Sequence, residues 1–556
     1  MARYTYQPFP YQPPPELDAA TASGRRWPVA IVGAGPIGLA AAIDLALHGV
    51  ESVVLDDNNV VSVGSRAICW SKRTLEVFDR LGVGERMVDK GVTWQLGRLF
   101  HHDQEVWNFD LLPESGHKMP AFINLQQYYV EEYLVERVQD FPEQIDLRWK
   151  NRVVGLDSSA EGVRLQVETP DGTYAVEAEY VLACDGAKSS IREMLGLEFA
   201  GKVFEERFLI ADVEMQADFP SERWFWFEPP FHAGQSALLH KQPDNIYRID
   251  LQLGWEADPE EEKRPEKVIP RIQAAVGDRE FELDWVSVYT FQCRRMERFV
   301  HGRVLFVGDS AHIVSPFGAR GGNGGVQDVD NLCWKLAAVL QGQAPEKLLE
   351  SYNTERIHGA DENLLNSSRS TNFMTPKTRT EQVFRDAVLS LAKEHAFARR
   401  LVNSGRLSLP ATLEPSPLNG EADADFAGVM CPGAPMLDAP VQDSGKSAWL
   451  LESFGGTFRL LHFPGPDTPS TPEALRVAEA GFEANTILVH PPESAPSDGL
   501  GLVDTEGLVQ QRYEGLPGTT YLIRPDQHVA ARWRTWSPEA VRQALRQATG
   551  NLRRDP

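Results

Sequence analysis

The sequence predicts a protein of the α/β class with several domains, and three observations lead to this prediction. A glycine-rich turn joins two apolar, β-branched runs between residues 28 and 56. Residues 201–293 alternate between apolar and polar positions, and strand-like and helix-like stretches alternate after residue 430. At about one domain per 150 residues, a chain of 556 residues corresponds to about two to four domains.

The charge balance excludes some classes of partner. Asp and Glu total 79 against 55 Lys and Arg, which gives a formal net charge of −24. A surface this acidic repels nucleic acid and anionic membranes, so we expect neither as a partner. The best apolar run is interrupted by Asp44 and His48, so we expect no transmembrane helix.

Residues 1–26 form a Pro-rich N-terminal arm, in which Pro10 and Pro13–Pro15 favour an extended conformation. Either this arm is a loosely ordered tail, or it packs its Tyr and Phe residues on a neighbouring subunit of a homodimer. The arm lacks the basic start and apolar run of a secretory signal. The five cysteines lie at least 40 residues apart and form no C-x-x-C pair, so we expect no metal site and a cytoplasmic location.

The glycine-rich turn lies in the segment PVAIVGAGPIGLAAAIDLALHGVESVVLD, residues 28–56. Val29–Val32 reads as a buried parallel strand, a helical pattern follows over Pro36–His48, and Ser52–Leu55 reads as a second buried strand. This strand–helix–strand order predicts a Rossmann-like domain, which we place at residues 27–410.

The turn itself has the pattern G-x-G-x-x-G. Its glycines permit the tight turn, close approach of a pyrophosphate and close helix–strand packing, respectively, and the helix N-terminus presents unpaired N–H groups to phosphates. An acidic residue 18 positions after the last glycine can accept hydrogen bonds from a ribose. The predicted binding residues are Gly33, Gly35, Pro36, Gly38 and Asp56. The pattern indicates an ADP-containing dinucleotide without deciding between FAD and NAD.

Two later segments narrow this choice. They read VLACDGAKSSIR (residues 181–192) and RVLFVGDSAHIVSPFGARGGNGGVQDVDNLCWKL (residues 303–336). Both resemble motifs of the single-component flavoprotein aromatic hydroxylases, the para-hydroxybenzoate hydroxylase group. The resemblance implies bound FAD, with contacts from Asp185 and Gly186, from Asp309 to the ribityl chain and from Pro316 beside the isoalloxazine ring.

The resemblance also implies that Gly321, Gly322 and Asn323 begin a helix whose N-terminus points at the flavin. Reduced flavin carries negative charge, and a helix N-terminus stabilises an anion. Two further FAD contacts carry over from the family: Arg66, in a segment that precedes a predicted helix (Lys72–Leu81), and Gln127, with Gln126 as the alternative register.

Residues 201–293 predict a mixed β-sheet inserted into the FAD domain, which the family uses to hold an aromatic substrate. The expected strands are residues 223–230, 236–242, 246–253 and 285–294. In one of them, Trp224 and Trp226 share one face and Phe225 and Phe227 the other, and at least one pair is expected to be ordinary core. The substrate-side residues implied by the resemblance are His240, Gln242 and Tyr289, and Arg248 is implied as a flavin contact.

The C-terminal third predicts a linker at residues 411–430 and a domain at residues 431–556. Its pattern resembles the thioredoxin-like domain of the longer phenol-hydroxylase branch, with helices expected at residues 472–482 and 537–550. Redox work in such a domain needs C-x-x-C, which is absent here, so we expect a structural or dimer-supporting role.

The resemblance implies an aromatic hydroxylase in which NADH or NADPH reduces FAD and O2 forms a flavin C4a-hydroperoxide that attacks an activated ring. A flavin-dependent halogenase is one alternative, because residues 224–229 loosely echo the W-x-W-x-I-P element of that class. A non-catalytic FAD-binding scaffold is another.

Overall fold

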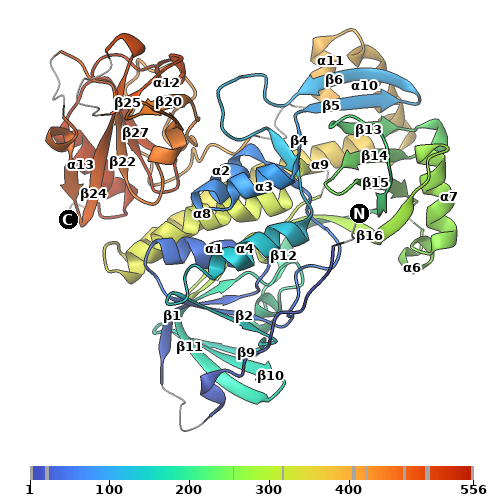
Figure 1. Ribbon diagram of the computed structural model, residues 1–556, viewed down its shortest axis with the longest axis horizontal. Helices are drawn as coiled ribbons and strands as arrows, with labels where there is room; N and C mark the ends of the chain where they lie inside the picture. The colour runs from blue at the N-terminus through green and yellow to red at the C-terminus, as the bar shows by residue number, and fades with distance from the viewer. Residues whose placement is uncertain are drawn as a thin grey trace.

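The computed structural model describes residues 4–18, 24–254, 256–315, 318–402, 409–420, 422–466, 471–494 and 501–552. One long helix, α8 (Gly321–Leu340), runs through the centre of the molecule (Figure 1). In that view a parallel sheet lies below α8, a second sheet lies to its right, and a C-terminal unit lies at the upper left. We call the second sheet the inserted sheet.

The parallel sheet confirms the expected Rossmann-like fold. Strands β18, β11, β1, β2 and β8 are neighbours in this order, and each neighbouring pair is parallel. Their apolar residues are buried, as expected for strands with helices on both faces. The strands of this sheet are β1 (Arg26–Val32), β2 (Ser52–Asp56), β8 (Ile145–Trp149), β9 (Arg152–Ser158), β10 (Val163–Thr169), β11 (Gly172–Ala183), β17 (Val300–His301) and β18 (Val304–Phe306).

Helix α1 (Pro36–Leu47) follows β1 directly and packs against α8. The crossing is close because glycines meet there. A Cβ atom at Gly325 would lie 2.7 Å from Ile37 Cδ1 and 3.1 Å from the Cα of Gly308. This contact fixes the start of α8 next to the glycine-rich turn at the start of α1.

The other helices are α2 (Lys72–Arg80), α3 (Gly84–Lys90), α4 (Gln127–Val138), α5 (Ser190–Met194), α6 (Pro259–Glu262), α7 (Pro265–Val276), α9 (Leu349–Met374), α10 (Arg379–Ala392), α11 (Ala396–Val402), α12 (Leu508–Arg512) and α13 (Pro538–Ala548). Within the described ranges, none of the helices is long and apolar enough to cross a lipid bilayer. A small sheet of β3 (Cys69–Ser71), β4 (Val92–Trp94) and β7 (Phe122–Asn124) is formed by residues that lie between β2 and β8 in sequence.

The inserted sheet is mixed, as expected. It has the order β19-β16-β12-β15-β14-β13-β5-β6, and only the β13–β5 pair is parallel among the pairs along it. The strands are β5 (Leu96–His101), β6 (Gln104–Asp110), β12 (Phe199–Glu214), β13 (Arg223–Phe227), β14 (Ser236–Lys241), β15 (Ile246–Leu253), β16 (Glu282–Met296) and β19 (His312–Ile313). Strands β5, β6 and β19 come from outside residues 201–293, so the sheet is larger than the sequence predicted.

The two faces of the inserted sheet bury different sets of residues. Phe225 and Phe227 pack on α9 and α10 and face the interior of the molecule, whereas Trp224 and Trp226 pack on the side of α7. This confirms the alternation predicted for the strand. We call these the inner and outer faces.

The N-terminal arm packs on its own chain over residues 4–18, so the expectation of a loosely ordered tail is wrong there, and packing on a neighbouring subunit stays a prediction. The ring of Tyr4 stacks on Tyr128 with centroids 4.2 Å apart, and Phe9 stacks on Trp149 at 4.6 Å. The Gly64 N–H also donates to the Tyr6 hydroxyl at 3.0 Å. Aromatic burial on the same subunit therefore holds the arm in place.

The C-terminal unit is built on a mixed sheet, with β22 parallel to β24 and antiparallel to β26. Its strands are β20 (Pro440–Asp443), β21 (Lys446–Trp449), β22 (Arg459–His462), β23 (Val477–Glu479), β24 (Phe482–His490), β25 (Leu502–Val503), β26 (Thr520–Ile523) and β27 (Val529–Trp533). The helix expected at residues 537–550 is α13. The helix expected at residues 472–482 is wrong, because Ala480 and Gly481 adopt positive φ angles in a turn that pairs β23 with β24.

The segment expected as a linker, residues 411–430, packs on the C-terminal unit in its described part. The Gly420 N–H donates to the Ala530 carbonyl at 2.7 Å, and Leu418 and Phe426 are buried in the two hydrophobic clusters of this unit. The boundary between the two units therefore lies before this segment.

A buried ion network joins the C-terminal unit to the central helices. Arg524, after β26, donates to both carboxylate oxygens of Glu355 on α9, at 2.6 and 3.0 Å. Lys335 on α8 donates to the same carboxylate at 2.6 Å, and all three side chains are fully buried. The C-terminal unit is thus bonded to the helix that begins at the candidate site.

Candidate active site

The glycine-rich turn has the conformation that its pattern predicts. Gly33 has φ +103°, and a Cβ atom there would lie 2.5 Å from the Cys184 carbonyl oxygen. A Cβ atom at Gly38 would lie 1.9 Å from the Gly33 oxygen, so both positions require glycine. A Cβ atom at Gly35 would meet no described atom within 4 Å, so the chain leaves room there for a ligand to approach.

Asp56 closes β2 beside this turn. Its carboxylate accepts hydrogen bonds from the Ala34 N–H at 2.5 Å and the Asn58 N–H at 2.8 Å. Burial raises the pKa of Asp56, and these two hydrogen bonds oppose the rise. Asp56 therefore holds the turn in shape, and its remaining lone pairs stay available for ribose hydroxyls.

Asp185 lies in a tight turn after β11 and carries an acceptor that no described atom satisfies. Its Oδ2 accepts from the Ile191 N–H at 3.1 Å, whereas its buried Oδ1 has no hydrogen-bond partner in the described structure. Gly186 follows with φ +76°. Because a buried carboxylate oxygen is costly without a donor, this atom fits a hydroxyl group of a bound ligand.

Asp309 lies in the short 3-10 turn Gly308–Ser310 that follows β18, close in space to the start of α8. Burial raises its pKa, and the charges of His312 and Arg66 oppose that rise. A Cβ atom at Gly321 would lie 3.8 Å from Asp309 Oδ1, so the aspartate and the helix N-terminus share one site. Arg192, of the Asp-Gly segment, donates to the Ser310 carbonyl at 3.0 Å and joins the two motifs.

The first turn of α8 is held against β3. Asn323 Oδ1 accepts from the Ser71 N–H at 2.9 Å, and Asn323 Nδ2 donates to the Cys69 carbonyl at 2.9 Å. A Cβ atom at Gly322 would lie 3.2 Å from Trp70. Any contact of Asn323 with a cofactor is therefore expected through its backbone. Pro316 lies outside the described residues.

Arg66 lies on the loop of residues 62–67, and Gln127, the first residue of α4, hydrogen-bonds to this loop. The Gln127 Oε1 accepts from the Ala67 N–H at 3.2 Å, and its Nε2 donates to Ser62 and Glu131. Gln126 is buried and donates to the Pro243 carbonyl at 3.2 Å, in the turn between β14 and β15. Gln127 thus supports the loop that carries Arg66, and Gln126 contacts the inserted sheet.

The inserted sheet contacts the same loop through Arg248. Its guanidinium donates to both oxygens of Asp212 at 2.8 Å and to the Ser65 carbonyl. Gln242 Nε2 donates to Asp212 Oδ1 at 3.1 Å, whereas the buried Gln242 Oε1 has no partner among the described atoms. The pair Arg248–Asp212 therefore positions Gln242 and leaves it one acceptor for a ligand.

His240 is buried on the inner face beside Asp250. The distance from His240 Nε2 to Asp250 Oδ2 is 4.0 Å, and the distance from His240 Nδ1 to Cys69 Sγ is 3.9 Å. Burial and the charges of Arg223 and Arg248 hold the pKa of His240 well below its usual value, so the imidazole is neutral. Burial raises the pKa of Asp250 to about 6, and its Oδ1 has no partner in the part of the chain that the structure describes.

An inner cavity of about 80 Å³ lies between β13 and α9. Its lining includes Leu99, Arg223, Phe225, Phe227 and Phe373. Tyr289 packs on the same hydrophobic cluster, and burial raises its pKa to about 12. Sequence reasoning missed Arg223, Asp250 and Phe373. Strand alternation could have placed the first two on the inner face, but no local signal indicated that α9 faces the sheet.

These features fit FAD in this chain. The open approach at Gly35, the unsatisfied acceptor at Asp185 and the turn with Asp309 follow the carboxyl ends of the parallel strands β1, β11 and β18, and the N-terminus of α8 lies beside Asp309. Phosphate, hydroxyl and ring anion are the groups that such donors and acceptors bind.

Comparison with known proteins supports the same cofactor. A family model described as FAD binding domain matches residues 26–367. A 3-(3-hydroxy-phenyl)propionate/3-hydroxycinnamic acid hydroxylase from Burkholderia cenocepacia is 31% identical over 521 residues, which cover 91% of this chain and 94% of the relative. A probable NADH-specific resorcinol 4-hydroxylase from Rhodococcus jostii is 28% identical over 520 residues, covering 90% of this chain and 91% of the relative.

The fold also matches solved structures over nearly its whole length. The flavin-dependent monooxygenase PieE, solved in complex with FAD and substrate, aligns with a TM-score of 0.77 at 23% identity and covers 94% of this chain and 99% of PieE. Aklavinone-11 hydroxylase, solved with FAD and aklavinone, aligns with a TM-score of 0.75 at 22% identity and covers 94% of this chain and 98% of the hydroxylase. The chain belongs to the FAD binding domain family, among its flavin-dependent monooxygenases and hydroxylases.

Proposed function

We propose that this chain uses FAD, NADH or NADPH, and O2 to hydroxylate a phenolic or similarly activated aromatic ring. The main support for this proposal is that the residues that fit FAD and the inner face of the inserted sheet lie next to each other. The motifs that fit FAD end at the N-terminus of α8, and the inner face of the inserted sheet, with its aromatic cavity, is bonded to the Arg66 loop through Arg248. A planar ring held on that face would lie next to the FAD site.

Bound FAD would supply the redox chemistry, because it takes a hydride from a nicotinamide and reduces O2. The chain itself would bind, orient and exclude water. The N-terminus of α8 presents N–H donors to negative charge, and Asp309 and Asp185 offer acceptors to hydroxyl groups. Phe225 and Phe227 would pack on the substrate ring.

A proton acceptor for a substrate phenol is also proposed. His240 was the sequence-based candidate, but an imidazole whose pKa lies well below its usual value is a weak base. Asp250, with a pKa of about 6 and an oxygen without a partner, is better matched to accept a proton near neutral pH. We therefore assign Asp250 Oδ1 as the acceptor and His240 as its neutral neighbour.

The halogenase alternative finds no support in the position of its sequence echo. Trp224 and Trp226 lie on the outer face, with the thickness of the sheet between them and the inner cavity. Only a measurement of hydroxylase activity distinguishes the proposed enzyme from a non-catalytic FAD-binding scaffold.

The test is a screen of purified holoprotein for NADH and NADPH oxidation with phenols, aminophenols and hydroxyphenyl acids, followed by product identification. We expect at least one class to stimulate oxidation and to yield a product one oxygen atom heavier. Oxidation that no aromatic compound stimulates, with no oxygenated product, would favour the scaffold. Protein without a flavin absorbance band that takes up no added FAD would overturn the proposal.

We also propose a homodimer, in line with the dimer-supporting role expected of the C-terminal domain, and a reducing cytoplasm, in line with the wide spacing of the cysteines. The five cysteines are free thiols in the structure, and Cys184 and Cys333 are buried. Light scattering of the purified chain tests the oligomeric state, and a monomeric mass at micromolar concentration would exclude the dimer.

A further inference from the structure

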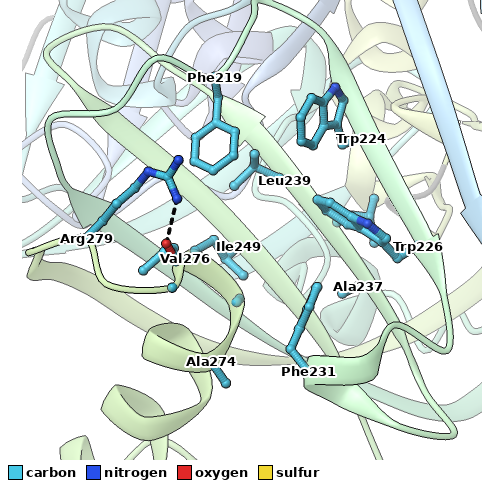
Figure 2. A pocket seen from close by; sticks show the side chains of 13 residues that line it. Phe219, Trp224, Trp226, Phe231, Ala237, Leu239, Ile249, Ala274, Val276 and Arg279 are labelled. Carbon is cyan, nitrogen blue, oxygen red and sulfur yellow. Dashed lines mark hydrogen bonds between the residues drawn. The ribbon is translucent and has the colours of Figure 1, made fainter. Parts of the chain in front are cut away.

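A cavity of about 310 Å³ lies on the outer face of the inserted sheet, beneath α7 (Figure 2). Its walls include four aromatic side chains, Phe219, Trp224, Trp226 and Phe231, and Arg279 stands at one side. None of these five side chains is fully buried. The cavity belongs to neither the FAD motifs nor the inner face, so the proposed hydroxylation does not use it.

The aromatic rings are arranged edge to face. Trp224 and Trp226 have centroids 5.7 Å apart at 77°, and Trp226 and Phe231 have centroids 5.6 Å apart at 80°. Phe219 meets Trp224 at 5.5 Å and 85°. Each ring thus contacts the next edge to face, and Figure 2 shows the four rings arranged around the cavity.

Arg279 adds a positive charge to this aromatic cavity. Its Nη1 donates to the Val276 carbonyl at 2.8 Å, and its Cζ lies 4.7 Å from the centre of the Phe219 ring. Figure 2 shows the guanidinium reaching from the end of α7 toward Phe219. The lining holds no other charged side chain among the described residues. Guanidinium groups bind carboxylates through paired N–H donors.

We propose that this cavity is a second ligand site, for an aromatic carboxylate of one or two rings. A volume of about 310 Å³ suits a ligand of one or two rings and excludes a dinucleotide. The aromatic side chains would contact the ligand face to face or edge to face, and Arg279 would bind the ligand carboxylate at the mouth of the cavity. The ligand would lie on the opposite face of β13 from Arg223 and Phe225.

The test is calorimetric titration of the FAD-loaded protein with 2-naphthoate. Ala274 lines the mouth from an exposed position on α7, so Ala274→Trp fills the opening without entering the core. The matched control is Ile269→Trp, an exposed position on the same helix that does not line the cavity. Arg279→Gln removes the charge, with the exposed Arg264→Gln as its control.

We expect Ala274→Trp to weaken 2-naphthoate binding at this site by about tenfold or more, and Ile269→Trp to leave it unchanged. Arg279→Gln should weaken it about threefold, as for an exposed charge pair, and leave the neutral 2-naphthalenemethanol unaffected. Binding that Ala274→Trp does not change would place the ligand elsewhere and overturn the proposal. Absence of any binding at millimolar ligand would overturn it as well. Neither outcome depends on hydroxylase activity.

Discussion

Asp309 is the residue on which cofactor binding is expected to depend most directly. It stands within reach of the α8 N-terminus, and the charge of Arg66 partly offsets the burial of its carboxylate. We expect Asp309→Ala to lose an acceptor for FAD and to purify as colourless protein. The ratio of absorbance near 450 nm to that at 280 nm measures this. The carboxylate is costly to bury, so melting of the apoprotein should not fall, and stoichiometric FAD in the variant would remove Asp309 from the site.

We predict that the ionisation of Asp250 controls how kcat/KM depends on pH. A base must be deprotonated, so kcat/KM of the wild type should rise as pH increases through about 6. Asp250→Asn should lose this limb and lower kcat/KM about 100-fold or more, with FAD content unchanged.

Stability distinguishes this role from a structural one. Burial raises the pKa of Asp250 in the folded state, so above pH 6 its ionised carboxylate lowers the free energy of unfolding. This loss of stability disappears as the pH falls from about 6 toward the ordinary pKa of an aspartate. At pH 8, Asp250→Asn should therefore melt no lower than the wild type. A lower melting temperature together with an unchanged pH profile would contradict the assignment.

At the scale of elements, the α1–α8 crossing sets the distance between the glycine-rich turn and the flavin-side helix N-terminus. Gly325→Val would place a side chain against Ile37 and Gly308, and overpacking of this kind costs about 1–3 kcal/mol. We expect a lower melting temperature and weaker FAD retention. Gln327→Val puts the same side chain at a partly exposed position of α8 and should change neither. Equal behaviour of the two variants would show that the crossing tolerates a side chain.

Sequence reasoning succeeded where a pattern of a few residues sets local structure. Gly33 and Gly38 are required by contacts within one turn, and alternation alone assigned Trp224 and Phe225 to opposite faces. It failed where distant segments decide. Strands β5 and β6, at residues 96–110, join the inserted sheet although they lie outside the segment predicted to form it. At residues 472–482, where a helix was expected, the chain instead forms a turn that pairs β23 with β24.

The site residues divide in the same way. The motif that ends at Asp56 was predicted because the spacing of its turn is local, and those around Asp185 and Asp309 because short segments resemble those of a known family. The proton acceptor was not, because the pKa of Asp250 depends on its burial and on the charges of Arg248, in the same strand, and Arg223, two strands away. Neither the residue type nor its position in a strand indicates the burial and the neighbouring charges that set this pKa.

At the scale of the whole molecule, the buried ion network predicts that the C-terminal unit and the FAD domain unfold together. Arg524→Met leaves Glu355 with less compensation, and breaking a buried pair costs about 3–5 kcal/mol. We expect a calorimetric trace with a lower first transition and a separate second one. Arg542→Met, which breaks an exposed pair with Glu539, should leave a single transition unchanged. A single, unshifted transition in Arg524→Met would show that the network does not couple the two parts.

The packing of the N-terminal arm affects where an affinity tag can be fused to the protein. Tyr4 and Tyr6 bring the beginning of the chain against Tyr128 and Gly64, two residues before Arg66, and Figure 1 shows this end of the chain beside β16. An affinity tag fused there would emerge next to the Arg66 loop and the inserted sheet, where we propose that FAD and substrate bind. A tag fused after α13 would emerge from the far side of the molecule, which makes that end the better choice for preparing the enzyme for kinetics.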